Sequence, residues 1–164
     1  MIETERLILR KYNLNDAPFI HSLLNSEGWI KNIGDRKIKT VDDAANYIRL
    51  NYFTSYEMWG YGPFLVSLKN SGKSIGSSGL YRRDDLGHPD IGFAFLPEFW
   101  NQGFAFEASK AVMRFAEKKL NIEKITGITL PDNLPSKRLL EKLGLSEIGN
   151  YTDKDGQVLR LFSN

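Results

Sequence analysis

Residues 96–108 constrain the fold of this chain most, because an apolar run leads there through a tight turn into a helix. The segment 90–96 is apolar on both alternating sets of positions, which predicts a strand covered on both faces. Residues 105–120 repeat apolar side chains every three or four positions, which predicts a helix. With a further strand expected at 124–130, this segment forms a strand-helix-strand unit, and such a unit pairs its strands in parallel.

The rest of the chain predicts a sheet that is mainly built from hairpins. Further strands are expected at 4–12, 62–68, 74–82, 146–151 and 157–162, helix starts at 15–18 and 40–43, and a short helix at 134–143. Polar turns at 69–73 and 153–156 join strands that must run antiparallel. The combination predicts a mixed sheet.

The turn between strand and helix is suited to a phosphate group. A helix N-terminus leaves about four backbone N–H groups without intrahelical partners, and the aligned peptide dipoles attract anions there. Gly103 and Ala105 carry almost no side chain, so a pyrophosphate can approach the main chain closely. Alternatively, Gly103 only ends a strand-to-helix loop. The spacing by itself leaves both interpretations open.

A second motif narrows the interpretation. Residues 131–145 read Pro-Asp-Asn-Leu-Pro-Ser-Lys-Arg-Leu-Leu-Glu-Lys-Leu-Gly-Leu. The order of strand, small-residue loop, helix, strand, Asn-x-x-Ser, helix and Leu-Gly-Leu resembles the GNAT acyl-CoA N-acyltransferase superfamily, and more narrowly its RimJ/RimL-like branch. From about residue 62 onward the resemblance rests on motifs. Before residue 62 it rests only on the pattern of expected strands and helices. Trp100 departs from the superfamily, since a basic or amide side chain is usual there.

The resemblance implies an α/β fold with a GNAT-like mixed, mostly antiparallel twisted sheet of about seven strands, helices on both faces and a splayed parallel strand pair at the cofactor site. It also implies an acetyl-CoA-dependent N-acetyltransferase that transfers an acetyl group directly to a primary amine of a small molecule or a protein N-terminus. The alternative is a catalytically weak or inactive CoA-binding sensor or interaction module. Leu140 permits that alternative, because many superfamily members have a tyrosine acid at its position.

The resemblance further assigns a cofactor site. Backbone groups of the strand end would hold the pantetheine, and the turn would hold the pyrophosphate: Phe93, Ala94, Phe95 and Leu96, followed by Asn101, Gln102, Gly103, Phe104 and Ala105. Asn133 and Ser136 would contact the cofactor arm. Asn133 fits equally well as the N-cap of the helix that follows, and both roles can hold at once.

Two catalytic groups are expected, Ser136 from the resemblance and Glu98 from its position near the turn. Ser136 is the candidate that protonates the leaving thiolate or orients a water, although it also fits a structural serine in a first helical turn. Glu98 is the candidate base, and its alternative is an ordinary surface charge. Asp90 is a second candidate, which would reach the amine through water.

Aromatic side chains gather in the N-terminal third, where an acceptor pocket is expected. The residues expected to bind the acceptor are Trp29, Tyr56 and Trp59. Core packing is the alternative for each. Glu57 and Asp35 are expected, from position alone, to attract a cationic amine.

Length and charge set the remaining expectations. The 164 residues fit one N-acetyltransferase domain spanning 1–164, as a monomer or homodimer. A net charge of +2, mixed along the chain, indicates neither a nucleic-acid nor a membrane partner. The chain has no cysteine, and His21 and His88 lie far apart, so no metal site is expected. No apolar run approaches about 18 residues, and a cytoplasmic location is expected.

Overall fold

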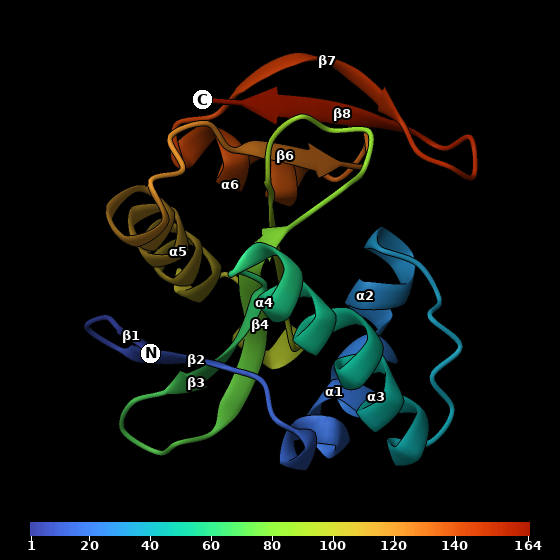
Figure 1. Ribbon diagram of the computed structural model, residues 1–164, viewed down its shortest axis with the longest axis vertical. Helices are drawn as coiled ribbons and strands as arrows, with labels where there is room; N and C mark the ends of the chain where they lie inside the picture. The colour runs from blue at the N-terminus through green and yellow to red at the C-terminus, as the bar shows by residue number, and fades with distance from the viewer.

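The computed structural model describes residues 1–164 and contains one eight-stranded sheet with helices on both faces (Figure 1). The strands are β1 (Ile2–Glu3), β2 (Leu7–Lys11), β3 (Pro63–Leu68), β4 (Ser74–Tyr81), β5 (Asp90–Phe95), β6 (Thr126–Thr129), β7 (Ser146–Thr152) and β8 (Val158–Ser163). The helical segments are η1 (Leu14–Asp16), α1 (Ala17–Leu24), α2 (Glu27–Asn32), α3 (Val41–Tyr47), η2 (Ile48–Phe53), α4 (Thr54–Trp59), η3 (Pro97–Phe99), α5 (Phe104–Leu120) and α6 (Leu134–Lys142).

The sheet is mixed, as the sequence predicts. Its strand order is β1-β2-β3-β4-β5-β6-β8-β7, and only β5 and β6 run parallel. The strand expected at 4–12 begins only at Leu7, and an unpredicted two-residue strand, β1, precedes it and raises the strand number to eight. The cause is a turn in which the Thr4 N–H donates to the Leu7 carbonyl at 3.0 Å and the Leu7 N–H donates to the Thr4 hydroxyl at 3.0 Å.

Two apolar clusters fill the two sides of the sheet. On one face, 17 buried residues pack between the strands and helices α5 and α6. Ala108, Val112 and Ala116 of α5 are fully buried there, which explains the helical periodicity of that segment. On the other face, 11 buried residues pack beneath α1, α2, α3 and η2. The cofactor motifs and the N-terminal aromatic residues therefore lie on opposite faces.

The N-terminal helices begin where the capping signals predict. Asn13 caps η1 directly before α1, and Thr40 forms a reciprocal capping box with Asp43 at the start of α3. From residue 41 the backbone stays helical through a π-helical segment to Trp59, because no proline or glycine interrupts it before Gly60. Gly60 ends the run in a left-handed conformation, with φ of 74°.

The sequence pattern does not predict helix α2. Ser26 caps this helix, and its hydroxyl accepts a hydrogen bond from the Trp29 N–H at 3.4 Å. Gly28 lies in its first turn and weakens the local helical signal. Packing of Trp29, only 6 % exposed, outweighs that weak propensity. None of the helices combines the length and apolar character needed to cross a membrane.

Candidate active site

Strands β5 and β6 form a fork. Their parallel pairing is limited to Asp90 opposite Thr126, where the Thr126 N–H donates to the Pro89 carbonyl at 2.8 Å. Beyond this point β6 stays paired with β8 along its other edge, from Thr126 to Thr129. The sheet therefore has an open seam that starts at Asp90 and widens toward the N-terminus of α5. A seam of this kind can accept a further extended chain through backbone hydrogen bonds.

The backbone of β5 divides its groups between the two edges. The Leu96 N–H donates to the Ile75 carbonyl of β4 at 3.0 Å. Because backbone groups alternate between edges along a strand, Ala94 also faces β4, where it lies opposite Ser77. Phe93 and Phe95 face the seam. Of the four strand residues predicted to hold the cofactor, Phe93 and Phe95 thus direct backbone groups into the seam. Ala94 faces β4, and the Leu96 N–H and C=O bond to Ile75 and Phe99.

Trp100 ties this strand to the opposite face of the sheet. Its indole N–H donates to the Phe95 carbonyl at 2.7 Å. Its ring lies so close to Gly28 of α2 that a Cβ at position 28 would overlap the ring. Trp100 is therefore a loop anchor, as its departure from the usual basic residue suggests, and it explains the glycine inside α2.

The turn before α5 has the backbone shape of an anion site. Asn101 and Gly103 both adopt left-handed conformations, with φ of 58° and 81°. The first helical bond runs from the Glu107 N–H to the Gly103 carbonyl at 3.0 Å, so the preceding N–H groups of the first turn have no helical acceptor. The Gln102 side chain donates to the Glu98 carbonyl at 2.8 Å and closes the turn.

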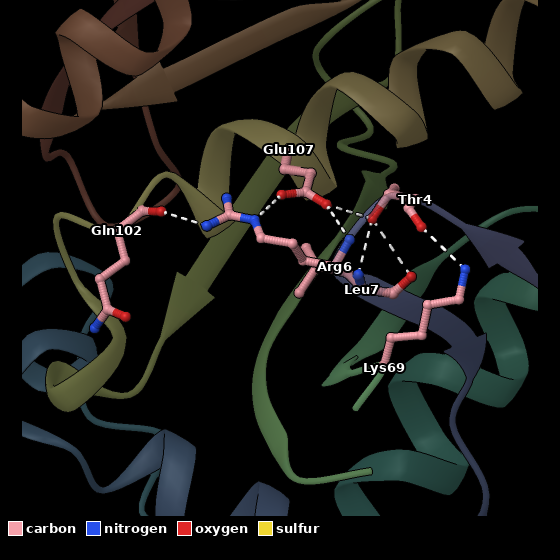
Figure 2. Close-up of polar contacts among 6 residues, drawn as sticks. All are labelled: Thr4, Arg6, Leu7, Lys69, Gln102 and Glu107. Carbon is pink, nitrogen blue, oxygen red and sulfur yellow. Dashed lines mark hydrogen bonds and ion pairs between the residues drawn. The ribbon is translucent and has the colours of Figure 1, made fainter. Parts of the chain in front are cut away.

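Arg6 supports this turn from the first strands, a contact that the sequence did not indicate. Its Nη1 donates to the Gln102 carbonyl at 3.0 Å, and its Nε lies 2.6 Å from a carboxylate oxygen of Glu107 (Figure 2). The guanidinium also lies 4.4 Å from the centre of the Phe104 ring. One arginine thereby holds the carbonyl before Gly103, the first turn of α5 and the ring at its start.

Glu107 is the centre of that contact network. Its carboxylate accepts hydrogen bonds from the Thr4 hydroxyl at 2.6 Å and from the Arg6 N–H at 2.9 Å. Partial burial alone would raise the pKa of Glu107, but the hydrogen bonds from Thr4 and Arg6 outweigh it and lower that pKa. A charged carboxylate in the first turn also suits the helix dipole. The spacing from residue 4 to residue 107 conceals this network in the sequence.

Helix α6 presents the second motif. The Asn133 side-chain oxygen accepts from the Ser136 N–H at 3.2 Å, so Asn133 is an N-cap, and its amide NH₂ makes no hydrogen bond within the chain. Ser136 is half-buried, and its hydroxyl makes no hydrogen bond within the chain. Leu140 is buried against Gly127 of β6, where it belongs to the core.

The two candidate bases lie at opposite ends of β5. Glu98 is exposed on η3, next to the turn that precedes α5. Asp90 is 2 % exposed at the closed end of the seam, and its Oδ2 lies 3.0 Å from Arg83 Nε. Its Oδ1 is buried without a hydrogen-bond partner. Burial raises the pKa of Asp90 to about 6, although Arg83 partly offsets the rise.

The three aromatic residues predicted to bind an acceptor take different positions. Trp29 belongs to the core beneath the N-terminal helices. The Tyr56 hydroxyl donates to the Pro63 carbonyl and accepts from the Tyr12 N–H, so it joins α4 to β3 and β2. Trp59 is 43 % exposed and lines a hollow over the end of β4. The structure thus brings one of the three to an open surface.

The comparisons with known proteins agree with this geometry. Residues 6–146 match the family described as the acetyltransferase (GNAT) domain. The uncharacterized N-acetyltransferase YnaD of Bacillus subtilis is 27% identical over 150 residues, which cover 92% of this chain and 85% of that protein. Among solved structures, a GNAT-family acetyltransferase from Bacillus anthracis superposes with a TM-score of 0.81 at 24% identity, covering 99% of this chain and 96% of that one.

RimL, a ribosomal alpha-N-protein acetyltransferase solved in complex with coenzyme A, superposes with a TM-score of 0.84 at 15% identity, covering 98% of this chain and 94% of its own. No group of three or more histidine, aspartate or glutamate side chains is arranged to hold a metal ion. The family match spans most of the chain, from β2 to the start of β7. The chain belongs to the acetyltransferase (GNAT) domain family, whose members are acyltransferases.

Proposed function

We propose that this chain transfers an acetyl group from acetyl-CoA to a primary amine at the seam between β5 and β6. The observation that carries the proposal is the pairing of β5. Phe93 and Phe95 direct backbone groups into a seam that leads from the α5 N-terminus to a buried carboxylate, Asp90. An extended pantetheine arm with a phosphate at one end matches that layout.

The residues present fit this co-substrate in three places. The first-turn N–H groups of α5 and the small residues Gly103 and Ala105 would hold the pyrophosphate. The C=O of Phe93 and the N–H of Phe95, which face the seam, would pair with the pantetheine amides. The amide NH₂ of Asn133 remains available to the cofactor arm, since the N-cap contact occupies only its oxygen.

Acetyl-CoA supplies an activated acetyl thioester when it is bound. The backbone N–H of Phe93 is placed to donate to the carbonyl oxygen as negative charge develops on it. Asp90 takes the proton of the attacking amine through water, and a pKa near 6 leaves it ionised but basic at neutral pH. This position favours Asp90 over Glu98, which lies at the phosphate end of the strand. Ser136 is the proposed donor, directly or through water, to the leaving thiolate.

Two measurements on one preparation test the proposal. Calorimetry with acetyl-CoA measures binding, and thiol release against a panel of amines and N-terminal peptides measures turnover, with intact mass confirming an acetylated product. Binding followed by thiol release supports acetyl transfer. Binding without release for any acceptor supports the CoA-binding module instead. The absence of binding contradicts both.

A further inference from the structure

The hollow beside Trp59 has an unusual set of walls for a site that receives amines. It encloses about 240 Å³ between η2, α4 and the end of β4. The residues that line it are Tyr47, Leu50, Asn51, Tyr52, Thr54, Ser55, Trp59, Pro63, Tyr81 and Arg82. Arg82 is the only charged side chain among them, and none of them is acidic. A wall of this composition attracts anions rather than cations.

Two arginines at this hollow lack acidic partners. Arg82 is exposed, its guanidinium lies 5.1 Å from the centre of the Trp59 ring, and it takes part in none of the ion pairs of the chain. Arg36 approaches the Tyr47 hydroxyl and also has no ion-pair partner. Elsewhere in the site the arginines are paired, Arg6 with Glu107 and Arg83 with Asp90. Arg49, Arg114 and Arg138 also lack ion-pair partners, but Arg82 is the only arginine that lines the hollow.

The acidic residues expected to attract an amine do not supply a counter-charge inside it. Glu57 does not line the hollow, and the carboxylate of Asp35 accepts from the Lys37 N–H at 2.7 Å in its own loop. By contrast, Tyr52 lines the hollow, is only 2 % exposed, and its hydroxyl is buried without a hydrogen-bond partner. The hollow therefore combines free cations with an unused neutral hydroxyl.

The hollow also leads toward the proposed base. Tyr81 lines it and lies opposite Asp90 in the ladder between β4 and β5. Its ring covers Gly92, where a Cβ would come within 2.6 Å of the ring. Tyr81 therefore lies both at the hollow and beside the closed end of the seam. An acceptor seated in the hollow can thus point its amine toward Asp90 while its other end faces Arg82.

We propose that the acceptor is an amine that also carries an anionic group, a carboxylate or a phosphate, and that Arg82 binds this group with Arg36 at the rim. This proposal rests on the acetyl transfer proposed above and names its substrate class. Arginine suits the role because its planar fork binds carboxylate and phosphate through two hydrogen bonds. The anionic group is common to free metabolites and to acidic peptide N-termini. Polyamines and other polycations are excluded as preferred acceptors.

Matched acceptors test the proposal. O-phosphoethanolamine is compared with ethanolamine, and the peptide Ala-Glu-Glu with Ala-Lys-Lys, by kcat/KM for thiol release and by calorimetric binding to the CoA-loaded protein. The first pair represents metabolites and the second represents peptide N-termini. We expect the anionic member of at least one pair to be preferred by about tenfold or more, as a charge-assisted hydrogen bond provides.

Variants of Arg82 test whether this residue causes the preference for anionic acceptors. Arg82→Gln should remove most of it through KM with kcat nearly unchanged, Arg82→Glu should reverse it, and Arg82→Lys should keep part of it. Arg114→Gln is the matched control, since Arg114 is exposed on α5 on the opposite face of the sheet. Equal or cationic preference, or an Arg82→Gln variant that behaves like Arg114→Gln, overturns the proposal. If anionic amines bind through Arg82 but no thiol is released, the substrate class stands and acetyl transfer fails.

Discussion

The two faces of the sheet differ in how they treat buried polar groups. On the α5 face the polar groups next to the helix are paired: the Ser78 and Ser109 hydroxyls lie 3.0 Å apart, and Glu107 is bonded to Thr4 and Arg6. On the face of the N-terminal helices, five polar groups are buried without partners: the hydroxyls of Tyr12, Tyr52 and Ser77, the indole N–H of Trp29 and Oδ1 of Asp90. Each buried polar group without a partner lowers the stability of the folded protein by about 1–3 kcal/mol.

This difference matches two different tasks. A CoA molecule offers the same phosphates and amides to every member of the family, so the face that holds them can be rigid and internally satisfied. Acceptors differ between members, and a face that retains unpaired hydroxyls can bind them through water or directly. The following experiments test whether the two faces have these different roles, from the largest expected effect to the smallest.

Gly103→Trp should abolish acetyl-CoA binding, with a loss of more than about 100-fold in affinity. The reason is that Gly103 has a φ of 81° and a new Cβ would lie 3.3 Å from Arg6 Nη2, so both turn shape and close approach are lost. Gly72→Trp is the control, because Gly72 has a φ of 70° in an open hairpin with nothing within 4 Å. Calorimetry should show unchanged binding for that variant, and similar losses in both would contradict a local role.

Asp90→Asn should lower kcat/KM by about 100-fold while leaving the affinity for acetyl-CoA unchanged. In the parent protein kcat/KM should rise with pH through about 6, as Asp90 loses its proton, and this rise should disappear in the variant. Glu98→Gln is the comparison. A larger loss in Glu98→Gln than in Asp90→Asn would return the base to the exposed end of β5.

Burial of the Asp90 carboxylate is also expected to lower the free energy of unfolding at neutral pH. Its folded-state pKa of about 6 lies above the usual 3.8, so the folded protein binds the proton more tightly than the unfolded chain. The free energy of unfolding should therefore fall as pH rises from about 4 to about 6, by up to about 2–3 kcal/mol from this group. Urea unfolding of Asp90→Asn should show a smaller fall over that window. Parallel pH curves for the two proteins would contradict the assigned burial.

Arg6→Gln should weaken acetyl-CoA binding by about five- to tenfold, since Arg6 holds the turn through the Gln102 carbonyl and Glu107 without itself touching the cofactor. Lys69→Gln removes a nearby cation whose partner Glu3 is half-exposed at 3.1 Å, and it should change binding by less than about twofold. A double-mutant cycle with Glu107→Gln should show that the effects of Arg6 and Glu107 are not additive.

Ser136→Ala should give the smallest effect, about three- to tenfold in kcat at constant affinity for acetyl-CoA, because an ordinary hydroxyl is a weak acid. Single-turnover kinetics separates this step from product release. A loss in affinity instead would identify Ser136 as a binding residue of the cofactor arm.

The face that we propose to bind the cofactor was largely predictable from the sequence, because its signals are local. Periodicity in α5, the small-residue turn at Gly103 and the cap at Asn133 each depend on a few neighbouring residues. The sequence could not predict which backbone groups of β5 face β4 and which face the seam, since this depends on the register between β4 and β5. Arg6 was missed because 101 residues separate it from Glu107. Trp29 could not be distinguished from Trp59 by sequence, since burial of an aromatic ring is decided by packing across elements.

The central claim is that Phe93 and Phe95 leave backbone groups free for the pantetheine, whereas Ala94 does not. Amide hydrogen exchange, resolved by residue, measures this directly in the free and CoA-loaded protein. We predict that the Phe93 and Phe95 amides exchange rapidly without ligand and become protected when CoA binds, while the Ala94 amide is protected in both states. Binding of CoA that leaves the Phe93 and Phe95 amides unprotected would contradict the assignment of the seam as the cofactor site.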